Sequence, residues 1–346
     1  MKIPEPENTI SALIDKYHES TAEPPRPHMG ASTLGHHCDR WLWLSFRWAV
    51  QPAFKGRILR LFRRGHNEEM TIVSDLRAIG MDVRNVSGKQ TRVDFGCHVS
   101  GSIDGIIEFG VPEAPNKRHV AEFKTHSLKS FNDLEKNGVI ESKPMHHTQM
   151  QVYMHGTGTD RALYVAVCKD DDRLYTERVR YDKAIAEKAI ERGQRLVKEE
   201  RLPPPISTDP SWYQCKFCDA HEFCHTTKIT KHANCRTCAH ATPLQDSTWR
   251  CELHQADGIP VDFQRTGCES HVLHPDLVPY DMREAESEWE AIYIINDKEV
   301  INGNPKNGTN RFTSKEILAN PTMVASGDET VNLLRETFDA RIVSDA

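Results

Sequence analysis

The pattern of hydrophobic and polar positions changes along the chain, and each change marks an expected element. Apolar residues recur at helical spacing through residues 55–79, until Gly80 ends the run. Other segments alternate or run apolar, are rich in β-branched residues and are bounded by turn residues, so we expect strands there. These strands are expected at 93–96, 99–110, 119–125, 162–169 and 174–181, with further helices at 127–137, 145–155 and 182–200.

Segments outside these expected helices and strands indicate how the chain divides into domains. Residues 1–30 are polar and punctuated by proline, and we interpret them as a flexible arm around a short helix at 9–17. Residues 31–50 are aromatic and predict a buried helix that carries Cys38. Mixed helices and strands in this order predict an α/β fold. The expected domains are the arm, a core over 31–228, a cysteine-rich module over 229–276, and a C-terminal region without an assigned role over 277–346.

The composition of the chain excludes several classes of protein. A formal net charge of −6 excludes a strongly basic surface that wraps nucleic acid, although it allows a local basic groove. No apolar run is long enough for a membrane span, and the first residues lack the apolar stretch of a secretory signal. We therefore expect a cytoplasmic protein. Ten cysteines and 18 histidines in such a chain indicate bound metal rather than disulfides.

Two carboxylates and a lysine are expected to gather on the strands. Glu122 and Lys124 are two residues apart in one expected strand, so they share a face, and Asp104 lies in the neighbouring hairpin. Such a group would bind a divalent cation and hold a water or phosphate oxygen beside it, as metal-assisted phosphodiester hydrolysis requires. An ordinary ion pair on a solvated strand face is the alternative interpretation.

Other residues are candidates to act together with Asp104, Glu122 and Lys124. His66 follows a basic helical stretch, and its imidazole is a natural third metal ligand. Gln149 and Tyr153 are four residues apart on one expected helix, from which both could contact a phosphate or Lys124. Ahead of His66, three arginines share a helical face and are expected to bind the DNA backbone: Arg57, Arg60 and Arg64.

This order of residues resembles the RecB-like branch of the PD-(D/E)XK nuclease superfamily. Those proteins carry a helix-borne histidine, an aspartate after a glycine-containing approach, an acidic-x-Lys strand and a Q-x3-Y helix. The matching residues are His66, Asp104, Glu122 with Lys124, and Gln149 with Tyr153. The resemblance implies a restriction-endonuclease-like core, with a central mixed sheet flanked by helices, and a DNA nuclease that depends on Mg²⁺ or Mn²⁺.

In that interpretation His66, Asp104 and Glu122 carry the metal, Lys124 assists attack by water, and Gln149 and Tyr153 position the strand. The chain departs from the pattern of the superfamily's name, since the proline expected before the aspartate is missing from the segment Gly101–Gly105.

Cysteines follow the expected core in a C-x2-C-x5-C spacing. Cys215, Cys218 and Cys224 leave a metal cluster one ligand short, and Cys38 is the obvious fourth ligand. The pattern resembles iron–sulfur nucleases of the same branch, the AddB nuclease domain and the CRISPR-associated RecB-like exonucleases. The resemblance implies a [4Fe–4S] cluster that closes the core. Thiolates also suit zinc, and spacing alone does not decide between the two metals.

A second set of cysteines resembles a zinc ribbon. Its members are Cys235, Cys238, Cys251 and Cys268, which would make a complete four-sulfur Zn²⁺ site. His254 and His271 each follow a cysteine by three residues and are possible substitute ligands. DNA and a protein partner are equally open as binding partners of this module. The two remaining cysteines, Cys97 and Cys168, are expected in the core.

The sequence therefore predicts a DNA exonuclease acting on single strands or duplex ends in recombination, repair or replication. No Walker-type motif is present, so a helicase, recombinase or single-strand annealing protein is a possible partner. By analogy, such an unfused nuclease resembles a protein of a phage or mobile element, which would place it in the bacterial host cytoplasm. Two alternatives stay open: a DNA-end adaptor with little or no catalysis, and an endonuclease or RNA-directed enzyme on the same fold.

Overall fold

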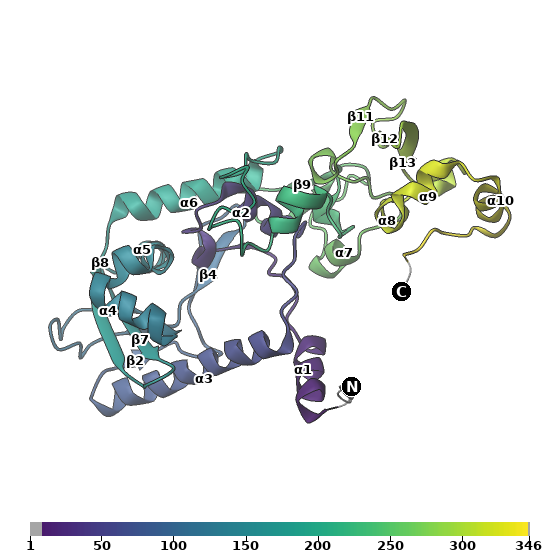
Figure 1. Cartoon of the computed structure of the whole chain (residues 1–346). Helices are drawn as coiled ribbons and strands as arrows, with labels where there is room; N and C mark the ends of the chain where they lie inside the picture. The colour runs from purple at the N-terminus through teal and green to yellow at the C-terminus, as the bar shows by residue number, and fades with distance from the viewer. Residues whose placement is uncertain (1–8, 345–346) are drawn as a thin grey trace, which may run out of the picture. The chain divides into compact units, whose positions relative to one another are not determined.

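The computed structural model describes residues 9–344 (Figure 1). The chain divides into two units by contact, one formed by residues 1–37 and 52–195 and the other by residues 38–51 and 196–346. The division falls within helix α6 (Lys183–Lys198). The domain boundaries that the sequence suggests at 228 and 276 stay predictions. Among the helices of the described residues, none is both long and apolar enough to cross a membrane.

The first unit is built on a five-stranded sheet of mixed direction. Its order is β2 (Val83–Arg84), β5 (Gly105–Ile107), β6 (His119–His126), β7 (Arg161–Cys168) and β8 (Leu174–Arg180). Strands β6 and β7 are parallel and the other neighbours are antiparallel. The parallel pair is joined through helices α4 (Leu128–Ser142) and α5 (Pro144–Thr157), as a parallel connection requires. The expected mixed α/β architecture is thus present.

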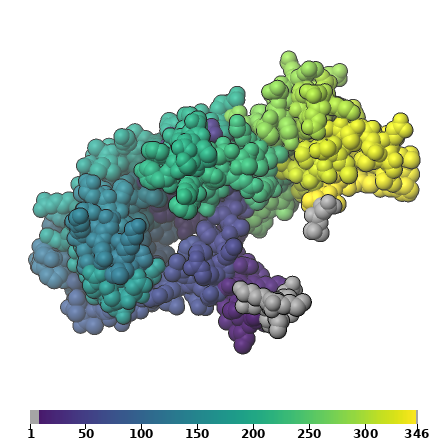
Figure 2. All heavy atoms as spheres, in the orientation of Figure 1, coloured from purple at the N-terminus to yellow at the C-terminus, as the bar shows by residue number. Residues whose placement is uncertain are grey.

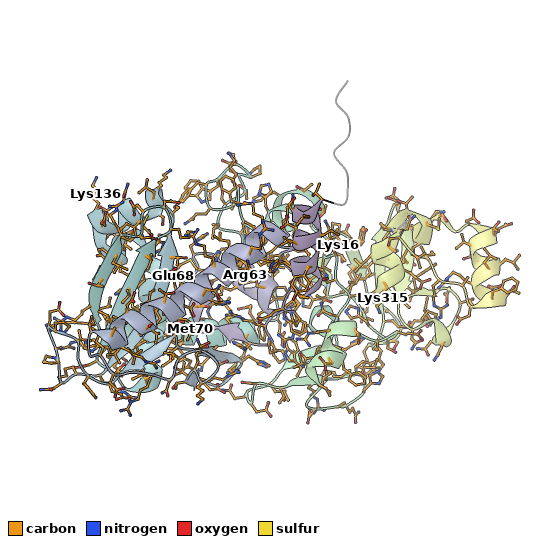
Figure 3. All side chains as sticks on the ribbon, turned by 90° about the horizontal axis from the view of Figure 1, so that it is seen from below. Lys16, Arg63, Glu68, Met70, Lys136 and Lys315 are labelled. Atoms are coloured by element: carbon orange, nitrogen blue, oxygen red, sulfur yellow. The ribbon has the colours of Figure 1, made fainter. Side chains whose placement is uncertain are left out.

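Alternation along β6 and β7 separates an apolar face of the sheet from a polar one. Ala121 and Phe123 of β6 pack with Leu163, Val165 and Val167 of β7 against apolar residues of α3 (Gly56–Ala78). Figure 3 shows α3 lying across these strands, with Arg63, Glu68 and Met70 labelled along it. The intervening residues of β6 face the opposite way. That second face carries Glu122 and Lys124, and α5 packs against it.

A smaller sheet adjoins the first in sequence. Its order is β1 (Met29–Gly30), β4 (Val99–Ser102) and β3 (Arg92–Asp94). The chain leaves β4 and enters β5 of the large sheet through Ile103 and Asp104, so Asp104 lies at the junction of two sheets. Helix α1 (Ile10–Ser20) begins at the N-cap Thr9 and confirms the short helix expected near the N-terminus. Residues 1–8 of the expected flexible arm lie outside the described residues.

In the second unit the aromatic segment forms a shorter helix than expected. Helix α2 covers only Asp39–Phe46, and the preceding residues form a 3-10 turn and a loop. Cys38 is therefore not within a helix. It is the N-cap of α2, because its backbone is extended and its sulfur accepts from the Trp41 N–H at 3.4 Å. The rings of Trp43, Phe46 and Trp48 are buried, which confirms core packing as their role.

The rest of this unit holds short strands and a C-terminal subdomain. A two-stranded ribbon, β9 (Ala241–Pro243) and β10 (Trp249–Cys251), precedes helix α7 (Val261–Thr266). The sheet that follows has the order β11 (Asp281–Arg283), β12 (Ala291–Ile295), β13 (Lys298–Asn302) and β14 (Arg311–Phe312). Helices α8 (Ser314–Ala319) and α9 (Pro321–Ser326) pack on its apolar core, and α10 (Glu329–Phe338) follows. This region, yellow-green to yellow in Figure 2, is thus an ordered subdomain.

Candidate active site

The structure brings Asp104, Glu122 and Lys124 together. Glu122 is fully buried, and its carboxylate forms an ion pair with the Lys124 ammonium. Lys124 Nζ is also 3.7 Å from Asp104 Oδ2, and the same Asp104 oxygen accepts from the Phe123 backbone N–H at 3.0 Å. Period-two alternation along β6 places Glu122 and Lys124 on one face, and the antiparallel pairing of β5 with β6 carries Asp104 to them.

Helix α5 places Gln149 and Tyr153 against the same carboxylates. Gln149 Nε2 donates to Glu122 Oε2 at 3.0 Å. Tyr153 lies one turn further on, where burial chiefly, and then the charges of Glu122 and Asp104, raise the pKa of its hydroxyl. The ring lies directly on the backbone at Gly101, since a Cβ there would be 2.9 Å from Tyr153 Cε1. Tyr153 therefore stays protonated and is a hydrogen-bond donor beside the carboxylates.

Burial and neighbouring charges shift the pKa values of Glu122 and Lys124. Burial is the main cause that raises the pKa of Glu122, to about 8; Asp104 and Glu69 raise it further, and Lys124 opposes them. For Lys124, burial lowers the pKa, but the carboxylates of Glu122 and Asp104 outweigh it and the net pKa is raised. Lys124 is therefore charged, while the excess of carboxyl groups favours a proton on Glu122 unless another cation is near.

Glu69 is a member of this group that the sequence interpretation missed. It lies on α3, three residues after His66, and burial and the charge of Asp104 raise its pKa while His66 and Lys124 lower it. The position of Glu69 one helical turn from His66 is the signal that could have found it. His66 itself is exposed, and among the described residues no hydrogen bond or ion pair joins it to Asp104 or Glu122.

A second polar layer lies beside Lys124. The Tyr164 hydroxyl on β7 is 2.8 Å from His126 Nε2 and 2.9 Å from His146 Nδ1, and Ser130 Oγ is 3.3 Å from His126 Nδ1. Burial chiefly, together with nearby lysines, lowers the pKa of His126 to about 4 and that of His146 to about 3. Both imidazoles are thus neutral at physiological pH. The layer ties α5 to β6 and β7 next to Gln149.

The donor set fits a hard divalent cation. The carboxyl groups of Asp104 and Glu122 contact the Lys124 ammonium, and the charges of Asp104, Lys124 and His66 act on the pKa of Glu69. Oxygen ligands of this kind are the ones that Mg²⁺ and Mn²⁺ prefer. As they stand, no three or more His, Cys, Asp or Glu side chains within residues 9–344 are grouped closely enough to hold a metal ion.

The three arginines expected to bind DNA differ in their surroundings. Arg60 forms an ion pair with Asp15 of α1, and Arg64 Nη2 donates to the Lys169 carbonyl oxygen at 2.9 Å. Arg57 is exposed near the start of α3. Two of the three guanidinium groups are thus already engaged within the first unit, while Arg57 and Arg64 are both exposed.

All four cysteines of the first set belong to the second unit. Burial chiefly, and then the charge of Cys38, raises the pKa of Cys215, and burial raises that of Cys218 to about 11. The pKa of Cys224 is raised by burial and by Cys38 and Cys215, while Arg40 opposes them. All four thiols are therefore within electrostatic reach of one another. A bound cation is the usual means of holding several such groups as thiolates.

The second cysteine set surrounds a cavity. The cavity has a volume of about 290 Å³, and its lining includes Cys235, Cys238, Cys251, Cys268 and His254. Burial and the neighbouring thiols raise the pKa of Cys235 to about 11. His271 also lines the cavity, but its ring atoms lie 2.7 Å from Ser314 Oγ and 2.9 Å from the Asn234 carbonyl oxygen. Both of its ring nitrogens are thus engaged in hydrogen bonds.

Comparison with known proteins finds distant similarity to solved structures. No protein-family model and no curated protein matches the chain. Among solved structures, SSO0001 has a TM-score of 0.39 at 16% identity, over 63% of this chain and 97% of that chain. An alkaline exonuclease from Laribacter hongkongensis has a TM-score of 0.34 at 16% identity, over 53% and 90%. A phage-related exonuclease from Haemophilus somnus has a TM-score of 0.32 at 15% identity, over 49% and 92%.

Proposed function

We propose that the chain is a divalent-metal-dependent DNA exonuclease of the RecB-like type. The observation that carries the proposal is the buried Glu122 carboxylate, which contacts Lys124 next to Asp104 and is oriented by Gln149. A fully buried carboxylate beside two other acidic groups is a costly arrangement in a merely structural ion pair. A cation bound among these groups would remove much of that cost.

In this proposal each residue has a chemical task. Asp104, Glu122 and Glu69, with His66, hold Mg²⁺ or Mn²⁺, which would offset phosphate charge and make a water more acidic. Lys124 orients the attacking water or neutralises the leaving oxygen. Gln149 fixes the Glu122 carboxylate through its 3.0 Å hydrogen bond, and the protonated Tyr153 hydroxyl donates to the substrate phosphate. Arg57 binds the DNA backbone as the strand enters.

The cysteine sets are proposed as structural metal sites. Cys38, Cys215, Cys218 and Cys224 would hold a [4Fe–4S] cluster, with zinc as the alternative. Cys235, Cys238, Cys251 and Cys268 would hold Zn²⁺. The mutual effect of the thiols on their pKa values supports both sets. We further propose that the enzyme acts in the cytoplasm on single strands or duplex ends in DNA recombination, repair or replication, with a helicase or recombinase as partner and a phage or mobile element as source.

Digestion of end-labelled single-stranded DNA with Mg²⁺ or Mn²⁺ tests the activity. Lys124→Ala should reduce the rate roughly 100-fold or more, because one pre-positioned cationic donor typically contributes that much. The matched control is Lys129→Ala, which removes an exposed lysine a few residues away on α4. A circular single strand separates exonuclease from endonuclease activity. If wild type is inert in both metals but binds DNA, the adaptor function replaces the proposed one.

A further inference from the structure

The described residues contain an aromatic surface that no role above uses. The rings of Trp43, Phe46 and Trp48 are buried, but those of Trp212, Tyr213 and Phe217 are 43%, 68% and 85% exposed. Phe217 is the most exposed large hydrophobic residue of the part of the chain that the structure describes. Three such rings within six residues, which we name the aromatic loop, make an unusual solvent-facing surface for a folded protein.

Local hydrogen bonds fix the aromatic loop. Cys215 N–H and Lys216 N–H both donate to the Trp212 carbonyl oxygen, at 2.8 and 2.9 Å. Trp212 Nε1 donates to Gln214 Oε1 at 3.3 Å, and the rings of Trp212 and Tyr213 lie 5.0 Å apart at 53°. The loop backbone and the Trp212 and Tyr213 rings are therefore held in place while these rings are exposed, so little conformational entropy would be lost when a ligand stacks on them.

The aromatic loop itself carries one positive charge. Between Ser211 and Cys218 the one charged side chain is Lys216, whose ammonium lies 5.5 Å from the centre of the Phe217 ring. Three acidic residues flank the loop. Asp209 accepts hydrogen bonds from Ser211, Glu222 forms an ion pair with Lys231, and burial raises the pKa of Asp219, two residues after Phe217. A planar, aromatic ligand that carries negative charge would satisfy both the rings and the lysine.

We propose that Trp212, Tyr213 and Phe217 stack on the bases of single-stranded DNA while Lys216 contacts a phosphate. The choice of DNA as occupant rests on the proposed function. Single-strand binding sites commonly pair aromatic side chains with basic groups, since every base offers a π face and every nucleotide a charge. The aromatic loop thus serves as a binding site for the substrate strand that is distinct in sequence from the catalytic residues.

Binding of a fluorescein-labelled oligothymidylate, measured by anisotropy with the full chain, tests this site. The parent protein is Lys124→Ala, so that digestion does not interfere and binding is scored whether or not the nuclease proposal holds. An abasic strand of the same length is the second probe, because it keeps the phosphates and lacks the bases. The parent should bind oligothymidylate more tightly than the abasic strand, by about 5- to 100-fold for each stacked ring.

The variants separate stacking from general hydrophobicity. Phe217→Ala and Phe217→Leu should both lose the share of the preference that one stacked ring contributes, about 5- to 100-fold, whereas Phe217→Trp should keep it. The matched control is Phe338→Ala, which removes a ring that is 72% exposed on α10 and should change nothing. Equal affinity of the parent for the two strands would overturn the proposal. An unchanged affinity of Phe217→Ala for oligothymidylate, together with a loss of self-association in sedimentation, would also overturn it. That result would assign the aromatic loop to a protein–protein contact.

Discussion

Replacement of Gly101 by alanine should displace Tyr153 from the candidate site. A Cβ at this position would be 2.8 Å from Ala31 Cβ, 2.9 Å from Tyr153 Cε1 and 3.0 Å from Tyr153 Oη. Favourable carbon contacts begin at about 3.5 Å. Since Tyr153 is buried, the ring cannot move without disturbing its neighbours, and overpacking of this kind costs about 1–3 kcal/mol.

The matched control is the same substitution at Gly65, beside His66 on α3. No heavy atom is found within 4 Å of a Cβ there, so Gly65→Ala should stabilise the helix by about 1 kcal/mol. Urea unfolding of both variants measures the free energies, and DNA digestion measures the activities. We expect Gly101→Ala to be less stable and less active than wild type, and Gly65→Ala to keep its activity. Wild-type stability and activity in Gly101→Ala would refute the placement of Tyr153.

Three further perturbations follow from the site and the cysteine sets. Tyr164→Phe removes the hydroxyl that contacts His126 Nε2 and His146 Nδ1 and should cost about 2–4 kcal/mol in urea unfolding. Tyr293→Phe, whose hydroxyl donates only to the Leu273 carbonyl oxygen, should cost about 1 kcal/mol, and equal costs would count against the polar layer. Because the pKa of Glu122 is about 8 without metal, a proton competes with Mn²⁺ for this carboxylate below that pH. Calorimetric titration should show the affinity for Mn²⁺ rising up to about tenfold per pH unit and levelling above pH 8. An affinity that does not change with pH would argue against Glu122 as a ligand. Elemental analysis should find less iron or zinc in Cys38→Ser than in wild type. The control is Cys97→Ser, which also replaces a buried cysteine and should keep the wild-type metal content. An equal metal content in both variants would exclude Cys38 as a ligand.

The strand pattern was sufficient to predict the centre of the site. Alternation along β6 alone places Glu122 and Lys124 on one face, and the hairpin before it carries Asp104 to the same place. Helical spacing likewise places Gln149 and Tyr153 on one side of α5. These predictions depend on local periodicity, which is a direct consequence of backbone geometry.

The sequence pattern did not predict the features of the site that depend on tertiary contacts. Tyr164 lies in an apolar run that indicates core, and its hydroxyl acquires partners because β6 brings His126 to it and α5 brings His146. Glu69 joins the site through the approach of α3 to the sheet. In the C-terminal subdomain the strands span two to five residues, too short for a periodic signal, and their order emerges only from pairing.

Hydrolysis of end-labelled DNA by Glu122→Gln tests the central claim most directly. The substitution keeps the shape and the hydrogen-bonding capacity of the side chain while removing the charge that is proposed to hold the cation. The matched control is Glu191→Gln, on an exposed position of α6. We predict Mn²⁺-dependent release of labelled nucleotides by wild type and Glu191→Gln, and none by a folded Glu122→Gln. Digestion by Glu122→Gln at the wild-type rate, or no digestion by wild type in either metal, would contradict the account.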